Sequence, residues 1–329
     1  MKEFASGDII IIVLYVDDLI ITGHSMDKIS NIKLSLQNTF EMTDLGFLHY
    51  FLGIQVWQKD DGFYLSQTKY ALDILKRFQV TDCKSVSTPI ASGLKLSKDM
   101  EGEDVDPTLY RQLVGSLVYL THTRPDISFA VSVVSRFLSS PKVPHWIAAK
   151  RILRYVKGTL TMGIYYSFHG DISLIGYLDS DWAGSVDDRK STIGYVVYLG
   201  AGPISWCSKK QSTIALSTTE AEYTMANEAA KEITWLRAIL SVLKQHHAGP
   251  SLLHCDNQSA ISLSKNLVFH ARSKHIEVYH HYIRHLLQQQ VIHLQYCKTE
   301  DQIADLFTKA LSEAKFVSLR HLLGLRAVT

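Results

Sequence analysis

Four acidic residues in the second half of the chain have the types and spacing of a metal site. Asp179 lies near the end of the strand-like stretch "SLIGYLDSD", and Asp256 ends the stretch "SLLHCD". If these strands are parallel neighbours, both carboxylates emerge at the edge of the sheet where α/β proteins form their sites. Glu222 and Asp305 stand on two expected helices. We therefore expect carboxylates from two strands and two helices to meet.

Helix periodicity selects Glu222 over its neighbour Glu220. Ser217 and Glu220 form the capping-box pattern that begins a long helix. The stripe that starts at Glu222 is apolar and continues through Ala226, Ala229, Ile233, Leu236, Leu240 and Leu243. The stripe that starts at Glu220 runs through Tyr223 and Asn227 and is mostly polar. We predict that Glu222 faces the sheet and that Glu220 caps the helix.

Asp305 is expected on the last helix of the chain. Thr299 and Gln302 form a second capping-box pattern, which predicts that this helix begins at Thr299. Asp305 then lies beside an apolar stripe made of Ile303, Leu306, Phe307 and Ala310.

The chemistry of four such acids follows from their repulsion. A single buried carboxylate is more often simply hydrogen-bonded, but four together require cations between them. Oxygen ligands at a sheet edge suit two Mg²⁺ or Mn²⁺ ions. Such a pair of ions activates a water and stabilises the leaving oxygen of a phosphodiester. The four acids therefore predict metal-dependent hydrolysis of nucleic acid.

The elements that position these acids alternate between strands and helices. Residues 171–329 are expected to form three strands, a helix over 218–244, a strand, helices that begin near 257 and 273, a strand and a further helix. This order predicts an α/β layer structure with a mixed five-stranded sheet and flanking helices.

The first half of the chain is expected to be α+β. Residues 8–23 are predicted to form a hairpin with an acidic turn, followed by a helix, a second hairpin and another helix. From 81 to 106 the composition changes to that of a connecting segment, and helices are expected after it. The helix over 145–157 carries a basic stripe, which fits a phosphate-binding or a solvated face equally, made of Lys150, Arg151, Arg154 and Lys157.

Bulk composition excludes few functions. The formal net charge of +2 over 329 residues does not by itself identify a nucleic-acid partner. Four scattered cysteines without a C-x-x-C pair indicate free thiols in a reducing compartment. No apolar run is long enough to cross a membrane, and no secretion signal is evident. We expect an intracellular protein, cytoplasmic or nuclear, without a membrane partner.

Several stretches resemble the RNase H domain of Ty1/copia-type retrotransposon Pol polyproteins of plants. They are "GYLDSDWAG", "DDRKSTIGYVVYLGAGPISWCSKKQSTIALSTTEAEY", "LHCDNQSAISLSKN" and "QIADLFTKAL". The resemblance implies Mg²⁺-dependent cleavage of the RNA strand of an RNA–DNA hybrid. It places the catalytic and metal-binding quartet on Asp179, Glu222, Asp256 and Asp305, the acids that the spacing selects.

Two details refine this resemblance. Integrases of the same fold family carry their glutamate last, whereas Glu222 comes second here, which favours hybrid hydrolysis over strand transfer. Many RNases H have a histidine shortly before the last aspartate, but the nearest here is His293, inside an expected strand. This departure predicts slower turnover.

Hybrid contacts are expected from four polar residues beside the acids, each equally able to cap a helix, namely Ser217, Thr218, Asn257 and Gln258.

The stretches "LYVDDLIITG", "DLGFLHYFLGIQV" and "YRQLVGSLVYLTHTRPDISFAVSVVSRF" resemble the copia-type reverse transcriptase. The resemblance implies that Asp17 and Asp18 belong to a polymerase metal site. It also places the nucleic-acid-binding primer grip on Phe51, Leu52 and Gly53. Polymerase chemistry needs another aspartate on an adjoining strand, and the only one before the turn is Asp8, which begins the hairpin itself.

We therefore interpret the chain as a 5′-truncated Pol fragment. Residues 1–80 are predicted to be a partial reverse transcriptase palm, 81–170 a connector and helical thumb or connection region, and 171–329 an RNase H domain. RNase H activity is expected and polymerase activity is not. The alternatives are an inactive or domesticated remnant that binds nucleic acid or the remaining Pol polypeptide, and a truncated gene model of an intact polymerase.

Overall fold

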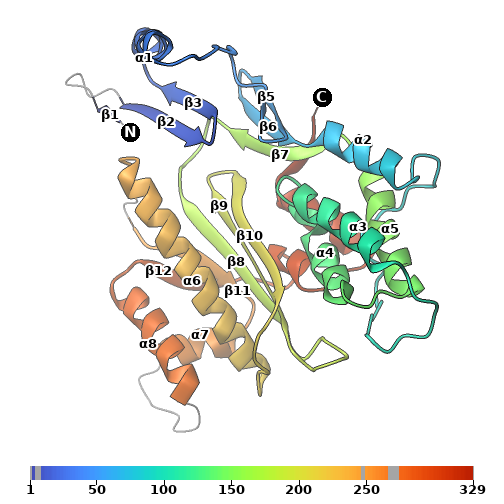
Figure 1. Cartoon of the computed structure of the whole chain (residues 1–329). Helices are drawn as coiled ribbons and strands as arrows, with labels where there is room; N and C mark the ends of the chain where they lie inside the picture. The colour runs from blue at the N-terminus through green and yellow to red at the C-terminus, as the bar shows by residue number, and fades with distance from the viewer. Residues whose placement is uncertain (1, 4–8, 246–248, 266–273, 329) are drawn as a thin grey trace.

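A mixed five-stranded sheet forms the centre of the second half of the protein, as predicted. The computed structural model describes residues 2–3, 9–245, 249–265 and 274–328. The sheet has the order β10-β9-β8-β11-β12, with antiparallel pairs on one side and parallel pairs on the other (Figure 1). Its strands are β8 (Leu174–Asp181), β9 (Thr192–Leu199), β10 (Gly202–Lys210), β11 (Ser251–Cys255) and β12 (Ile292–Tyr296).

Helices cover one face of this sheet and bury the apolar stripe of the long helix. They are α6 (Thr218–Val242), α7 (Gln258–Lys265) and α8 (Lys274–Gln288). Ala229 and Ile233 of α6 are fully buried against the sheet, as the periodicity predicts. Tyr223 and Asn227 are buried too, so the prediction of a polar face was wrong. The reason is that α6 also packs against α8, which covers a second side of the helix.

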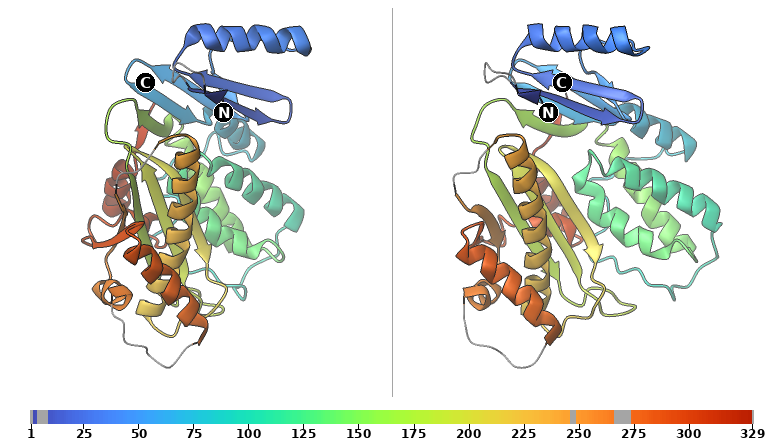
Figure 2. Two further views of the ribbon diagram at one scale, coloured as in Figure 1. Left: turned by 90° about the vertical axis from the view of Figure 1, so that its left-hand side faces the viewer. Right: turned by 60° about the vertical axis from the view of Figure 1, so that its left-hand side comes forward.

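The opposite face of the sheet packs against helices from the middle and the end of the chain (Figure 2). Alternation along β9 explains this: Ile193 and Val197 face α6, whereas Val196 and Tyr198 join the other core. This second layer consists of α3 (Pro107–Leu120), α4 (Ser128–Val134), α5 (Val143–Lys157) and α9 (Glu313–Leu322), with three 3₁₀ helices at Pro125–Ile127, Ser135–Phe137 and Ile303–Phe307.

A second sheet joins segments that are far apart in the sequence. Its order is β13-β7-β6-β5-β4, and all its pairs are antiparallel. The helix α2 (Thr68–Arg77) follows this sheet's third strand along the chain. The strands are β4 (Tyr50–Phe51), β5 (Ile54–Lys59), β6 (Gly62–Ser66), β7 (Met162–Ser167) and β13 (Leu325–Ala327). The pairing of β6 with β7 and of β7 with β13 was not expected from the sequence.

The expected acidic hairpin forms a small sheet of its own. It comprises β1 (Lys2–Glu3), β2 (Ile9–Tyr15) and β3 (Asp18–Gly23), and α1 (Met26–Thr39) follows. Asp8 lies outside the described residues. Ile10 is fully buried and Ile29 nearly so, whereas the tip of the hairpin is exposed.

The basic stripe on α5 is largely engaged within the protein. Arg151, Arg154 and Lys157 donate hydrogen bonds to groups of the segment 83–88. Lys150 lies over the ring of a neighbouring tryptophan. These bonds fasten the connecting segment to the helix and favour a structural role. In the described part of the chain, no helix is long and apolar enough to cross a membrane.

Candidate active site

Two of the four acids are brought together by parallel strand pairing. The register of β8 and β11 places His254 opposite Tyr177. Asp179 and Asp256 follow two residues later on the adjoining strands, so both carboxylates lie at the carboxyl end of the sheet. Asp179 is only 1% exposed, and Asp256 is half-buried. The strand arrangement predicted from the sequence is confirmed.

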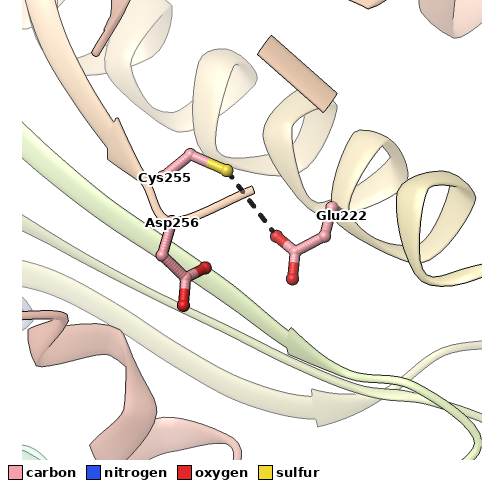
Figure 3. Close-up of side chains that lie close together, drawn as sticks. All are labelled: Glu222, Cys255 and Asp256. Atoms are coloured by element: carbon pink, nitrogen blue, oxygen red, sulfur yellow. Dashed lines mark hydrogen bonds between the residues drawn. The ribbon is translucent and has the colours of Figure 1, made fainter. Parts of the chain in front are cut away.

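Glu222 enters the same place from the second turn of α6. It is 5% exposed, and its carboxylate, the Cys255 thiol and the Asp256 carboxylate offer atoms that lie within 4.8 Å of one another (Figure 3). The Cys255 Sγ lies 3.8 Å from Glu222 Oε2. Ser217 caps α6 by accepting a hydrogen bond from the Glu220 backbone N–H. The inward orientation of Glu222 agrees with the prediction from periodicity.

Asp305 reaches the site from a shorter element than expected. The predicted helix beginning at Thr299 is not formed; Asp305 lies in the 3₁₀ helix Ile303–Phe307, which Gln302 caps. Gln302 also donates to the Leu178 carbonyl at 3.0 Å, which fixes this helix beside β8. The Thr299 hydroxyl instead donates to Asp256 Oδ2 at 3.4 Å. Tertiary partners of these side chains therefore outweigh the local capping pattern.

Two lysines that the sequence analysis did not select complete the cluster. Lys309 Nζ lies 2.7 Å from Asp305 Oδ1 and 3.1 Å from Asp179 Oδ2. Lys315 Nζ lies 2.5 Å from Asp305 Oδ2. The Thr308 hydroxyl also donates to Asp179. The i, i+4 spacing of Asp305 and Lys309 is a signal that could have identified the first lysine.

The electrostatics of the site show strong mutual repulsion. Burial, together with the neighbouring Asp179 and Asp256, raises the pKa of Glu222 to about 9. Burial raises the pKa of Asp179 to about 6, although Lys309 opposes the shift. Acids shifted this far at the end of a sheet are typical of functional sites.

The donor set fits hard divalent ions. Carboxylate oxygens are the ligands that Mg²⁺ and Mn²⁺ prefer. Burial raises the pKa of the Cys255 thiol, so this thiol stays protonated at neutral pH and is a poor metal ligand. Burial is the main cause of the raised pKa values of Glu222 and Asp179, and cations bound between the carboxylates would favour their charged forms.

A cleft of about 670 Å³ opens above the acids. Its lining includes Asp179, Glu222, Asp256 and three of the four expected hybrid-binding residues, Thr218, Asn257 and Gln258. Asn257 Oδ1 also accepts from the Ala260 backbone N–H, which makes it a helix cap. Of the four, Ser217 is the residue that the cleft lining does not include.

A second cleft of about 490 Å³ continues from the first. Asp181, Trp182 and Lys309 line both clefts. Lys95 from the connecting segment and Arg189 from the loop after β8 line the second one, and both are exposed. The connecting segment and the sheet domain therefore both contribute cations to a cleft that shares three lining residues with the cleft of the acids.

The expected polymerase residues lie in two exposed turns. Asp17 and Asp18 are exposed at the tip of the β2–β3 hairpin. Phe51, Leu52 and Gly53 form the tight β4–β5 turn, in which Leu52 and Gly53 have φ of 48° and 79°. The Tyr119 hydroxyl of α3 donates to the Leu52 carbonyl at 2.6 Å and holds this turn. Among the described residues, neither aspartate belongs to a group of three potential metal ligands.

Known proteins resemble this chain both in its first 92 residues and over nearly its whole length. Residues 1–92 match the family described as reverse transcriptase (RNA-dependent DNA polymerase). The retrovirus-related Pol polyprotein from transposon RE1 of Arabidopsis thaliana is 42% identical over 97% of the chain. The one from transposon TNT 1-94 of Nicotiana tabacum is 43% identical over 99% of the chain. The chain spans 22% and 25% of these two polyproteins.

Solved structures and a shorter relative extend these similarities. A structure of the foamy viral protease-reverse transcriptase dRH in complex with ds DNA has a TM-score of 0.50 at 12% identity and covers 88% of this chain and 46% of that chain. LC11-RNase H1 in complex with RNA/DNA hybrid has a TM-score of 0.32 at 14% identity, over 41% of this chain and 94% of that chain. A transposon Ty5-1 protein of Saccharomyces cerevisiae is 35% identical over 68% of the chain and 74% of its own length. The chain belongs to the family of Pol polyproteins from copia-type retrotransposons.

Proposed function

We propose that the chain hydrolyses the RNA strand of RNA–DNA hybrids with two Mg²⁺ or Mn²⁺ ions. The observation that carries this proposal is that Asp179, Glu222 and Asp256 line one open cleft. Asp305 does not line this cleft, but it shares Lys309 with Asp179 and so lies beside the three. Lys309 and Lys315 pair with Asp179 and Asp305, yet burial and the neighbouring Asp179 and Asp256 still raise the pKa of Glu222, which a purely structural role does not explain. The order of the acids, with Glu222 second, supports hybrid hydrolysis over strand transfer.

Each side chain has a role that its position suggests. Asp179, Glu222, Asp256 and Asp305 would hold the ions, which activate a water and stabilise the leaving oxygen of the phosphodiester when bound. The cleft is open to solvent, which suits a polymeric substrate better than a small molecule that has to be enclosed.

Hybrid recognition is assigned to polar groups beside the acids. Thr218, Asn257 and Gln258 line the cleft. In this proposal their side chains contact ribose 2′-hydroxyls, the groups that distinguish RNA from DNA. Ser217 is assigned to the capping of α6.

We also propose an assignment of domains along the chain. We assign residues 1–80 to a partial palm, 81–170 to a thumb or connection region and 171–329 to the RNase H domain. The match of residues 1–92 to the reverse transcriptase family and the fold shared with the foamy viral enzyme support this division. We propose no polymerase role for Asp17 and Asp18 in these residues: both are exposed at the hairpin tip, and polymerase chemistry needs a further aspartate on an adjoining strand.

The test is hybrid cleavage by the purified chain. A duplex of labelled RNA with DNA is incubated with the protein and Mg²⁺, and products are separated by length. We expect wild type to cut the RNA strand and Asp256→Asn to leave it intact while it binds the hybrid normally. Equal inactivity of the two proteins, with normal binding by both, would refute the nuclease and support a remnant that only binds nucleic acid.

A further inference from the structure

Lys309 occupies a position between two of the buried acids. Its Nζ lies 2.7 Å from Asp305 Oδ1, and 3.2 and 3.1 Å from Asp179 Oδ1 and Oδ2. The carboxylates of Asp179 and Asp305 are only 2% and 1% exposed, whereas the lysine side chain is 35% exposed. The ammonium group therefore reaches into the cluster from the surface of the cleft.

Physical chemistry explains why a cation is needed there. Two carboxylates buried side by side are not stable as anions without a counter-charge. An ammonium is a compact point charge with three donors on a flexible stem, so it can bond to both acids at once. Asp179 also accepts a hydrogen bond from Thr308, and Asp305 an ion pair from Lys315. The protein's own donors thus satisfy the oxygens that a metal ion would use.

We propose that Lys309 is a resident counter-ion that competes with divalent cations for Asp179 and Asp305. A bound Mg²⁺ requires its ligand oxygens at about 2.0–2.1 Å in octahedral geometry, and an oxygen so engaged repels a second cation on the same side. The lysine must then leave Asp179 when the ion enters. Its half-exposed stem and its place on the wall of both clefts give it room to do so.

This inference takes one thing from the proposed function, namely that the ligand of the site is a divalent ion. Competition makes a definite prediction about affinity. Removing the charge of Lys309 while keeping its length should strengthen metal binding, because no cation has to be displaced. A lysine with a merely structural role would either leave the affinity unchanged or weaken it through local disorder.

The experiment is calorimetric titration of Mn²⁺ into the full chain without nucleic acid. We expect K309M to bind Mn²⁺ about tenfold more tightly than wild type, which corresponds to about 1.4 kcal/mol. K309R keeps a positive charge and should remain closer to wild type. K210M is the matched control, because Lys210 forms a comparable pair with Asp188, at 2.6 Å, outside the acid cluster. An unchanged or lower affinity of K309M, with its circular dichroism intact, overturns the proposal.

A second measurement on wild type keeps the proposal testable if K309M does not fold. Lysine amines are labelled with an acylating reagent in two conditions, one containing EDTA and one containing saturating Mn²⁺. The labelled sites are then identified by mass spectrometry. We expect Mn²⁺ to increase the labelling of Lys309 several-fold and to leave Lys210 unchanged. Equal labelling of Lys309 in both conditions overturns the displacement.

The two proposals fail in distinguishable ways. Tighter Mn²⁺ binding by K309M in a protein that cuts no hybrid would support the counter-ion and refute the nuclease. Hybrid cleavage by wild type together with unchanged Mn²⁺ affinity in K309M would support the nuclease and refute the counter-ion. Absence of Mn²⁺ binding by folded wild type would refute both.

Discussion

The protein contains two acidic groups at strand ends, and they differ in almost every physical respect. Asp17 and Asp18 stand exposed on a two-stranded tip, on a small sheet whose apolar residues are largely in solvent. Asp179, Glu222 and Asp305 are buried at the end of a five-stranded sheet with a core on each face. Similar acidic side chains are therefore exposed on a hairpin turn in one region and form a buried cluster with raised pKa values in the other.

The difference teaches where chemistry can be expected. Buried acids crowd one another, their pKa values rise, and only bound cations or protons relieve them. Exposed acids on a turn are stabilised by water and need nothing else. A family motif identifies ancestry in both regions, but only the buried group has the environment that a metal site requires.

The largest expected effect is on hybrid cleavage. Glu222→Gln keeps the size of the side chain and removes a charged ligand, so we expect the rate to fall about a thousandfold, or about 4 kcal/mol of transition-state stabilisation. The double variant of Asp17→Asn and Asp18→Asn should cleave the hybrid at a rate within about twofold of wild type, because distant sites act independently. Single-turnover cleavage of the hybrid measures both. A comparable loss in the double variant would remove the contrast between the regions.

Much of this contrast could be predicted from the sequence. Strand ends and helix periodicity identified Asp179, Asp256 and Glu222, because these features depend on a local alternation that a short stretch of sequence contains. The five-stranded sheet and the hairpin of Asp17 were predictable for the same reason. Their role in catalysis remains a prediction.

Other features depend on contacts between distant segments. Nothing in the local sequence of β6 indicates that it pairs with β7, about a hundred residues later. Thr299 matches a helix-capping pattern, yet its hydroxyl bonds Asp256 of another element. Lys309 has no apolar stripe to mark it, and its role is visible only once Asp179 and Asp305 lie on either side of it. Tertiary structure overrides local preference at these positions.

The second prediction concerns ion pairs, which also differ between regions. Asp126 accepts two bonds from the Arg124 guanidinium and one from Tyr155, and the pair is almost fully buried. Asp126→Asn should lower the free energy of unfolding by about 3 kcal/mol, because it leaves an uncompensated buried charge. Asp44→Asn, which breaks the more exposed pair with Lys33, should lower the free energy of unfolding far less, because solvent screens this pair. Urea denaturation compares the two variants.

The buried pair of Asp126 and Arg124 should also change how the free energy of unfolding depends on pH. Burial acts to raise the pKa of Asp126, but the charge and hydrogen bonds of Arg124 lower it on balance. A folded pKa below the unfolded value of about 3.9 stabilises the protein above that pH, and this contribution is lost as pH falls through the folded pKa. The stability of Asp126→Asn should therefore fall less steeply than that of wild type below about pH 4. Parallel acid profiles would contradict this account.

The third prediction tests whether the connecting segment assists the buried site. Lys95 and Arg189 line the second cleft, which shares Asp181, Trp182 and Lys309 with the cleft of the acids. The double variant of Lys95→Ala and Arg189→Ala should weaken hybrid binding about fivefold and reduce the slope of log affinity against log salt by about one to two. Fluorescence anisotropy at several salt concentrations measures both quantities. A weaker affinity with an unchanged salt slope would show that neither side chain meets a phosphate.

The smallest expected effect lies at the tip of the exposed hairpin. Leu14 is 69% exposed, so its apolar surface contributes little to the folded state in this chain. Leu14→Ser should change the free energy of unfolding by no more than about 0.5 kcal/mol, the usual range for a surface substitution. Urea denaturation of the two proteins decides the matter, and a loss above about 1 kcal/mol would mean that the tip packs against the rest of the protein. The hairpin would then share the burial that distinguishes Asp179, Glu222 and Asp305, and exposure would no longer explain why one acidic group is strained and the other is not.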